Sequence, residues 1–188
     1  MRTLIKTLTT GGFIAPRVYV HPGVWFDQSG AKVEHLSTKC AAFFVFLEGL
    51  QEVKGSVSGM GSVLPLSTSL AEFANKVAAI QCLLADKIST IDRASVDEGC
   101  LKAVKKSMDR DTGAPAIDVC KYAQAVNNLL KESLIFEKWL DIAHDSSPQL
   151  HQLVRFLQQV ILPIVVSDLR VLLLRYIHKY ANQVTSKE

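Results

Sequence analysis

Residues 33–50 read VEHLSTKCAAFFVFLEGL and contain the pattern that decides the fold. Apolar residues recur in this stretch with spacings of 3, 4, 3, 4 and 3, at Val33, Leu36, Cys40, Phe43, Leu47 and Leu50. Because an α-helix turns once in about 3.6 residues, this spacing predicts a helix with one continuous apolar stripe. Phe44 and Phe46 lie beside the stripe, so we expect other elements to cover this helix on more than one side. The Gly/Ser-rich residues 54–62 are expected to end it.

A second stripe of the same kind predicts a helix over residues 66–89. Its apolar residues recur at intervals of three or four, at Leu66, Leu70, Phe73, Val77, Ile80, Leu84 and Ile88. The connection from the first helix is only about ten residues long, and short connections favour antiparallel neighbours. We therefore expect the two stripes to face each other in an antiparallel helix pair.

Two further helices are expected in the middle of the chain. The pattern Ser95–Glu98 has the form of a capping box, which predicts a short helix over residues 96–108. Pro115 suits the first turn of a helix, and the apolar residues that follow it predict a helix that continues to about His144.

The last predicted helix is the longest. Ser147 is a typical N-cap residue and Pro148 suits the first helical position, so the helix is expected to begin there and to reach about Asn182. Pro163 lies inside it and has no backbone N–H to donate. It therefore predicts a kink near residues 159–163.

Residues 1–29 differ in composition from the rest of the chain. Glycines and prolines, with the β-branched Val18 and Val20, disfavour a helix and favour extended backbone, so we expect an extended N-terminal arm. A strand at residues 17–20 would need a partner edge, and the sequence shows no second strong strand. The arm contains Phe13, Tyr19, Trp25 and Phe26. These aromatic residues are too many for a solvated linker, so the arm is expected to pack on the bundle.

The predicted fold is therefore all-α, an antiparallel helical bundle of four long helices plus one short helix, with an extended N-terminal arm. We expect the arm to span residues 1–29, the bundle residues 30–184 and a disordered tail residues 185–188. A bundle of this size is also compatible with one domain of a larger protein.

Charge and composition exclude several classes of protein. The 188 residues include 21 basic and 18 acidic side chains that are interleaved, so the weak field gives no case for nucleic-acid binding. The most apolar run, 160–177, contains Asp168, Arg170 and Arg175, which predicts a buried helix rather than a transmembrane span. Four cysteines without a CxxC pair indicate a reducing compartment, which we interpret as the cytoplasm. No acidic residue precedes Asp27, which leaves the mitochondrion as the alternative.

The sequence contains no recognised catalytic, phosphate-binding or cofactor motif, so we expect no enzymatic activity and no cofactor. His144, Asp145 and His151 flank a predicted helix start. The two histidines are seven residues apart, which does not match the four-residue spacing of a helix-borne zinc pair, and no metal site is expected. Cys100 lies near a helix start, where the helix N-terminus lowers a thiol pKa, but we interpret it as a structural thiol.

Three surfaces are candidates for binding a partner: the aromatic residues of the arm, the basic face of the short helix and the charges within the last helix. Their residues are Tyr19, Trp25, Phe26, Lys102, Lys105, Lys106, Arg110, Arg170 and Arg175. For the last helix two interpretations stay open. Asp168, Arg170 and Arg175 form an exposed polar stripe on a buried helix, or they are the rim of a surface that binds a partner helix. In the second case the contacts would come from Leu169, Leu172, Leu173, Tyr176 and Tyr180.

The leading hypothesis is a non-enzymatic adaptor or scaffold module that binds a partner peptide or helix, or that self-associates. The alternative is a carrier of an apolar or anionic lipid ligand within the bundle. Its cavity would be lined by Phe43, Phe44, Phe46, Phe73 and Trp139, with Lys105, Lys106 or Arg110 near the headgroup. Core packing is the competing interpretation of these aromatic residues.

Overall fold

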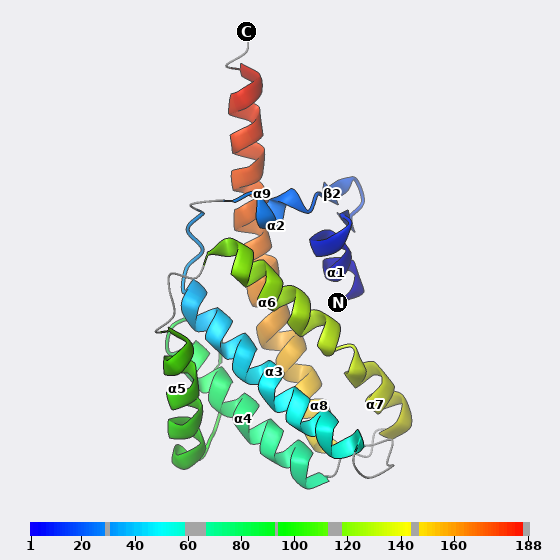
Figure 1. Cartoon of the computed structure of the whole chain (residues 1–188), viewed down its shortest axis with the longest axis vertical. Coiled ribbons are helices and arrows are strands. Elements are labelled where there is room, and N and C mark those ends of the chain that lie inside the picture. The colour runs from blue at the N-terminus through cyan, green and yellow to red at the C-terminus, as the bar shows by residue number, and fades with distance from the viewer. Residues whose placement is uncertain (29–30, 59–66, 93, 113–117, 144–146, 186–188) are drawn as a thin grey trace.

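The chain folds as a helical bundle, which confirms the predicted all-α class (Figure 1). The computed structural model describes residues 1–28, 31–58, 67–92, 94–112, 118–143 and 147–185. Within these ranges a two-stranded hairpin is the only sheet.

Helix α3 (Leu36–Ser58) is the centre of the bundle and packs against α4 (Ser67–Ala85), α5 (Glu98–Thr112) and α6 (Val119–Glu132). Contact on several sides agrees with the wide apolar surface predicted for α3. Helices α3 and α4 run in opposite directions and lie side by side, as their facing stripes predict (Figure 1).

An aromatic cluster fills the core where α3 meets its neighbours. The ring of Phe46 lies 5.1 Å from that of Phe73 and 5.8 Å from that of Phe156, centroid to centroid, and the second pair is stacked. Phe136 contacts Phe46 edge to face, and Trp139 contacts Phe136 in the same way. All five side chains are buried. The cluster therefore joins four helices that are far apart in the sequence.

The expected end of the first helix is wrong, because α3 continues through Lys54 and Gly55 to Ser58. A single helical glycine costs only about 1 kcal/mol relative to alanine. Val53 is buried and Val57 is half-buried against the core, which offsets that cost. The rest of the predicted loop, residues 59–62, lies outside the described residues.

The short helix begins later than the capping box predicts. Its first residue is Glu98, because the carboxylate of Asp97 accepts hydrogen bonds from the backbone N–H groups of Gly99 and Cys100, at 2.9 and 3.1 Å. Asp97, and not Ser95, is therefore the cap. In the next helix, α6, Asp118 caps the start by accepting from the N–H of Lys121. The predicted start at Pro115 lies outside the described residues.

The fourth predicted helix is two helices. Helix α6 ends at Glu132, and α7 (Ile135–Ala143) begins after a turn at Ser133 and Leu134. Short-range bonds, such as Phe136 N–H to Ser133 O, close this turn. The break redirects the chain so that Phe136 and Trp139 of α7 reach the aromatic cluster. The apolar spacing alone does not predict this change of direction.

The last helix begins as predicted, with Ser147 as N-cap and Pro148 in the first turn. It consists of α8 (Pro148–Phe156), the π-helical turn η1 (Leu157–Ile161) and α9 (Leu162–Thr185). The π turn occupies the segment where Pro163 predicts a disturbance. Because Pro163 donates no hydrogen bond to the preceding turn, the backbone changes its bonding there, and Leu162 N–H bonds the carbonyl of Leu157.

The N-terminal arm is not extended throughout, which corrects the prediction for residues 1–29. It contains α1 (Arg2–Thr9), a hairpin of β1 (Gly12–Ala15) and β2 (Val18–Val20), and the short α2 (Gly23–Phe26). The missed helix has a visible signal, since Leu4, Ile5 and Leu8 are three and four residues apart and face the core. Strand β1 is the partner edge that the sequence did not show. The arm packs on the bundle as predicted, against α6 and α9.

Candidate functional site

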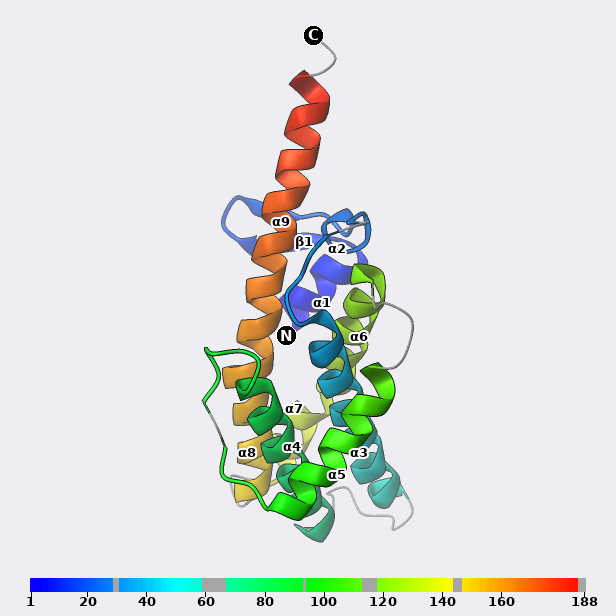
Figure 2. The same cartoon turned by 90° about the vertical axis from the view of Figure 1, so that its left-hand side faces the viewer.

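The last helix, α9, has two faces with different surroundings. Figures 1 and 2 show it leaving the bundle and projecting beyond the arm. On its inner face Leu169 and Leu172 are buried. The side-chain amide of Gln28 donates to the carbonyl of Leu172 at 3.0 Å, and Lys179 donates to the carbonyl of Asp27 at 3.2 Å. The segment after α2 therefore holds the inner face in place.

The opposite side of α9 is apolar and exposed. We define the outer face by Val166, Arg170, Leu173, Leu174 and Ile177, which fall on one side at 3.6 residues per turn; of these, Leu173 is half-buried against the core. Val166, Leu174 and Ile177 are 51, 55 and 53 % exposed. A helix that is apolar on both sides is normally covered on both. In the described part of the chain, the outer face thus leaves three aliphatic side chains half-exposed to solvent.

Basic side chains lie on the outer face and at one edge of it. Arg170 lies within it and His178 lies at its edge, and both are exposed. Arg175 is also exposed, but seven residues after Asp168 it lies on the inner side of α9. The sequence has no Asp or Glu between residues 169 and 187. This half of the helix therefore combines an apolar surface with a positive potential.

A buried ion pair sets how α9 sits on the bundle. The ammonium of Lys39 in α3 lies 2.7 Å from Oδ1 of Asp168, and the hydroxyl of Tyr122 in α6 donates to Oδ2 at 2.5 Å. All three side chains are buried. Asp168 is thus not part of an exposed polar stripe with Arg170 and Arg175, which corrects one of the two interpretations. A charged group on a buried face must be paired, and Lys39 is its partner.

This ion pair changes the acidity of its neighbours. Burial and the negative charge of Asp168 together raise the pKa of the Cys40 thiol to about 12. The pKa of the Tyr122 hydroxyl is also raised, first by burial and then by Asp168. Both groups keep their protons at neutral pH, so the Tyr122 hydroxyl remains a donor to the carboxylate.

The arm residues proposed for partner binding have three different surroundings. Trp25 is fully buried, and its indole N–H donates to the hydroxyl of Thr7 at 3.2 Å. It is a core residue of this chain and is not accessible to a partner, which corrects its assignment. Phe26 is half-buried against the core. Tyr19 is 49 % exposed and contacts Phe13 edge to face at the surface of the hairpin.

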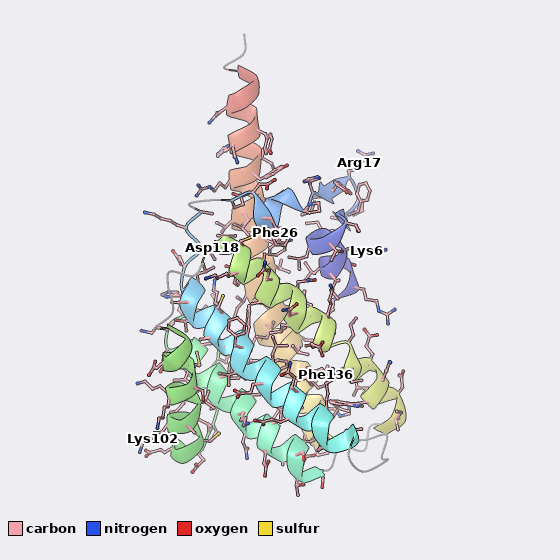
Figure 3. The ribbon with its side chains drawn as sticks, viewed as in Figure 1. Lys6, Arg17, Phe26, Lys102, Asp118 and Phe136 are labelled. Atoms are coloured by element: carbon pink, nitrogen blue, oxygen red, sulfur yellow. The ribbon has the colours of Figure 1, made fainter. Side chains whose placement is uncertain are left out.

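The basic face of the short helix is at the surface, where Lys102, Lys105 and Lys106 are all exposed. Lys102 lies 3.5 Å from Glu98, one turn earlier. The side chain of Arg110 lies outside the described residues. Figure 3 shows Lys102 and Arg17, at the tip of the hairpin, on opposite sides of the molecule. The structure therefore does not unite the three predicted surfaces into one site.

Residues expected to line a lipid cavity pack against one another instead. Phe43, Phe46, Phe73 and Trp139 are buried, and rings or aliphatic side chains surround them. Phe44 points away from this cluster and is 43 % exposed. The core interpretation of the aromatic residues is therefore the one that the structure supports.

The remaining chemical candidates lie apart from α9. Burial, followed by the charge of Asp97, raises the pKa of Cys100, which is opposite to activation by a helix N-terminus. The ring Nδ1 of His151 lies 2.9 Å from the carbonyl of Ser147. His144 and Asp145 lie outside the described residues. In the part of the chain that is described, no three His, Cys, Asp or Glu side chains converge as metal ligands.

The outer face of α9 and the partner of Asp168 were only partly visible in the sequence. Leu173 was among the expected contacts, but Leu169 and Leu172 belong to the inner face. The heptad-like spacing of Val166, Leu173 and Ile177 was the available signal. Nothing in the spacing indicates that Lys39 reaches Asp168 from 129 residues away.

Comparison with known proteins identifies no relative that shares this geometry. No protein-family model, curated protein or solved structure matches the chain. None of the described helices is long and apolar enough to cross a membrane. A functional proposal therefore rests on the outer face of α9 and its surroundings.

Proposed function

We propose that this protein is a non-enzymatic interaction module, an adaptor or scaffold, that binds an amphipathic helix of a partner protein along the outer face of α9. The observation that supports this proposal is the exposure of Val166, Leu174 and Ile177 on a helix whose other side is already buried. Large exposed apolar patches on folded proteins mark interaction sites.

The geometry of the outer face suits a helix. From Val166 to Ile177 it covers about three turns, roughly 17 Å at 1.5 Å per residue. Val166, Arg170, Leu173 and Ile177 are separated by 4, 3 and 4 residues, the spacing of a coiled-coil seam, with a charged residue at one position and the half-buried Leu173 at another. Binding of a partner helix would remove three half-exposed aliphatic side chains from water.

The charges favour an acidic partner over a second copy of this chain. Two copies of α9 in contact through their outer faces would bring Arg170 of one close to Arg170 of the other, and like charges at an interface are repulsive. An acidic helix would instead pair with Arg170 beside the apolar contact. We therefore propose a partner helix with aliphatic residues on one face and Asp or Glu beside them.

A site-specific photo-crosslinker tests this proposal in cells. We would place the photo-reactive residue at Leu174 and at Ile177, and as a matched control at Lys138, which is exposed on α7. The expected result is one crosslinked partner protein from Leu174 and Ile177 but not from Lys138. Mass spectrometry should place the crosslinks on an acidic amphipathic segment of that partner.

Three outcomes would contradict the proposal. Crosslinks between copies of this chain would indicate self-association, and lipid adducts would indicate a membrane surface. An equal pattern from all three positions would indicate that the outer face has no special affinity.

We also propose the cytoplasm as the compartment. Its support is that Cys40, Cys82, Cys100 and Cys120 are all free thiols. Unpaired cysteines are typical of proteins in reducing compartments.

A further inference from the structure

A recess lies beside the buried ion pair, between α3, α9 and the segment after α4. It consists of two adjoining hollows of about 300 and 410 Å³. Both are lined by Lys39 of α3, by Ile88 and Thr90 of the segment after α4, and by Ser167 and Asp168 of α9. The charged pair therefore forms the meeting point of the two hollows.

The smaller hollow, which we call the inner hollow, is lined by five apolar residues and five polar or charged ones. Ile88, Ile91, Val160, Pro163 and Ile164 line it, together with the polar Gln159 at its edge. A volume of about 300 Å³ is at the lower limit of the range for small-molecule pockets. This hollow suits a short alkyl group.

The polar groups at the meeting point are mainly hydrogen-bond donors. Both oxygens of Asp168 already accept, one from Lys39 and one from Tyr122. An ammonium has three N–H bonds, and among the described residues Asp168 is the one side-chain partner of Lys39. The hydroxyls of Thr90 and Ser167 lie in the same lining. The site therefore offers hydrogen-bond donors to a ligand that carries hydrogen-bond acceptors.

The larger hollow, which we call the outer hollow, favours a negative charge. Lys32 and Lys87 line it with one acidic side chain, Glu34, besides the paired Asp168. His35 also lines it. Apart from the Lys39–Asp168 pair, whose charges cancel, the lining contains two positive lysines and one negative glutamate. An anion would therefore meet a favourable potential before it reaches Lys39.

We propose that this recess binds a small monocarboxylate that carries a short alkyl chain. The carboxylate accepts from the Lys39 ammonium and the hydroxyls of Thr90 and Ser167. The alkyl chain lies between Ile91, Val160 and Ile164. This binding site is separate from the outer face of α9, and it does not depend on the helix-binding proposal.

Titration of the full chain with octanoate tests the inference, with octylamine as the probe of opposite charge. We expect amide NMR shifts at Thr90 and Ser167 that saturate with octanoate and are at least fivefold weaker with octylamine at equal concentration. Gln159→Glu adds a negative charge to the lining and should weaken octanoate binding about fivefold. Gln158→Glu makes the same change at an exposed neighbour that does not line the recess, and should leave binding unchanged.

Each other outcome overturns the inference. Shifts spread over the surface, or equal effects of octanoate and octylamine, would indicate unspecific apolar association. Equal weakening by Gln159→Glu and Gln158→Glu would indicate a general charge effect. An unchanged spectrum with a folded protein would show that the ion pair is purely structural.

Discussion

The ammonium of Lys39 and the carboxylate of Asp168 form a buried ion pair, 2.7 Å apart, that joins α3 to α9 across 129 residues of sequence. The side chains are each 7 % exposed. Removing two charges from water costs several kcal/mol, and a close, well-bonded geometry is needed to offset that cost. Tyr122 completes the geometry from α6. The pair thereby fixes the rotation of α9 and decides which of its sides faces solvent.

Breaking this pair should strongly destabilise the fold. Lys39→Met leaves the Asp168 carboxylate with Tyr122 alone, so we expect the free energy of unfolding to fall by about 3–5 kcal/mol. Urea denaturation followed by circular dichroism measures this change. Lys76→Met removes one partner of the more exposed pair between Lys76 and Glu52 and should cost at most about 1 kcal/mol.

The double variant Lys39→Met/Asp168→Leu separates charge from packing. Apolar residues that replace both partners remove the unpaired charge, so most of the lost stability should return. A double variant as unstable as Lys39→Met alone would show that the loss came from packing and not from the carboxylate.

Gly49→Ala should destabilise the protein, although alanine favours the helical conformation more than glycine does. A Cβ atom added to Gly49 would lie 2.7 Å from the ring of Phe73, so α3 or the ring must move. Overpacking of this kind costs about 1–3 kcal/mol, which exceeds the roughly 1 kcal/mol that alanine gains in a helix. We expect Gly49→Ala to lower the free energy of unfolding by about 1 kcal/mol.

Gly55→Ala is the matched control in the same helix. No atom lies within 4 Å of the added Cβ, so only propensity should act. We expect this variant to gain about 1 kcal/mol in thermal or urea denaturation. Equal effects of the two substitutions would contradict the close approach of α3 and α4 at Gly49.

The helices that the sequence predicted best are those with a long apolar stripe. The spacing from Leu36 to Leu50 and from Leu70 to Leu84 is dictated by burial along α3 and α4, so periodicity alone locates both. The start at Ser147 was predictable because an N-cap is a local hydrogen bond between the side chain and the backbone three residues later.

The errors arose where distant contacts decide the structure. The turn at Ser133 depends on where the aromatic cluster lies. Helix α1, by contrast, was missed although the spacing of Leu4, Ile5 and Leu8 is a local signal for it. The same limit applies to the candidate site. The apolar residues of α9 were visible, but their division into Leu172 inside and Leu174 outside depends on the partner that Asp168 finds in α3.

The arm should depend on the hydrogen bond between Thr7 and Trp25. Thr7→Val keeps the shape of the side chain but removes the acceptor for a fully buried indole N–H. An unsatisfied buried donor costs about 1–3 kcal/mol, and we expect a loss of that size in urea denaturation. Thr9→Val is the control, because Thr9 is exposed and its hydroxyl bonds only backbone carbonyls. Its effect should stay within about 0.5 kcal/mol.

The stability of the fold should decrease in alkaline solution. Burial and Asp168 raise the pKa of Cys40 to about 12, and the pKa of Tyr122 is raised by the same causes. The unfolded chain releases the thiol proton near pH 8.5, whereas the native chain retains it. The contribution of Cys40 to the free energy of unfolding is therefore complete below about pH 8.5 and is lost as the pH rises to 12.

Urea denaturation at several pH values between 8 and 11 measures this effect. Cys40→Ala should make the decline of the unfolding free energy shallower, since one of the groups with a raised pKa no longer titrates. Cys82→Ala removes a buried thiol that lies outside the ion pair. In this variant the unfolding free energy should decline with pH as steeply as in the wild type. A slope that both variants reduce equally would argue against a special role of the charge on Asp168.

The two sides of α9 should respond oppositely to substitution, which tests the geometry that the proposed function requires. Leu172→Ala removes a fully buried side chain and should cost about 2–5 kcal/mol in unfolding free energy. Leu174→Ala, two residues later and 55 % exposed, should change stability by no more than about 0.5 kcal/mol. If Leu174→Ala also unfolds the protein readily, the outer face is covered within the chain and is not available to a partner. If stability is unchanged but the crosslinked partner is lost, the outer face is retained for binding rather than for folding.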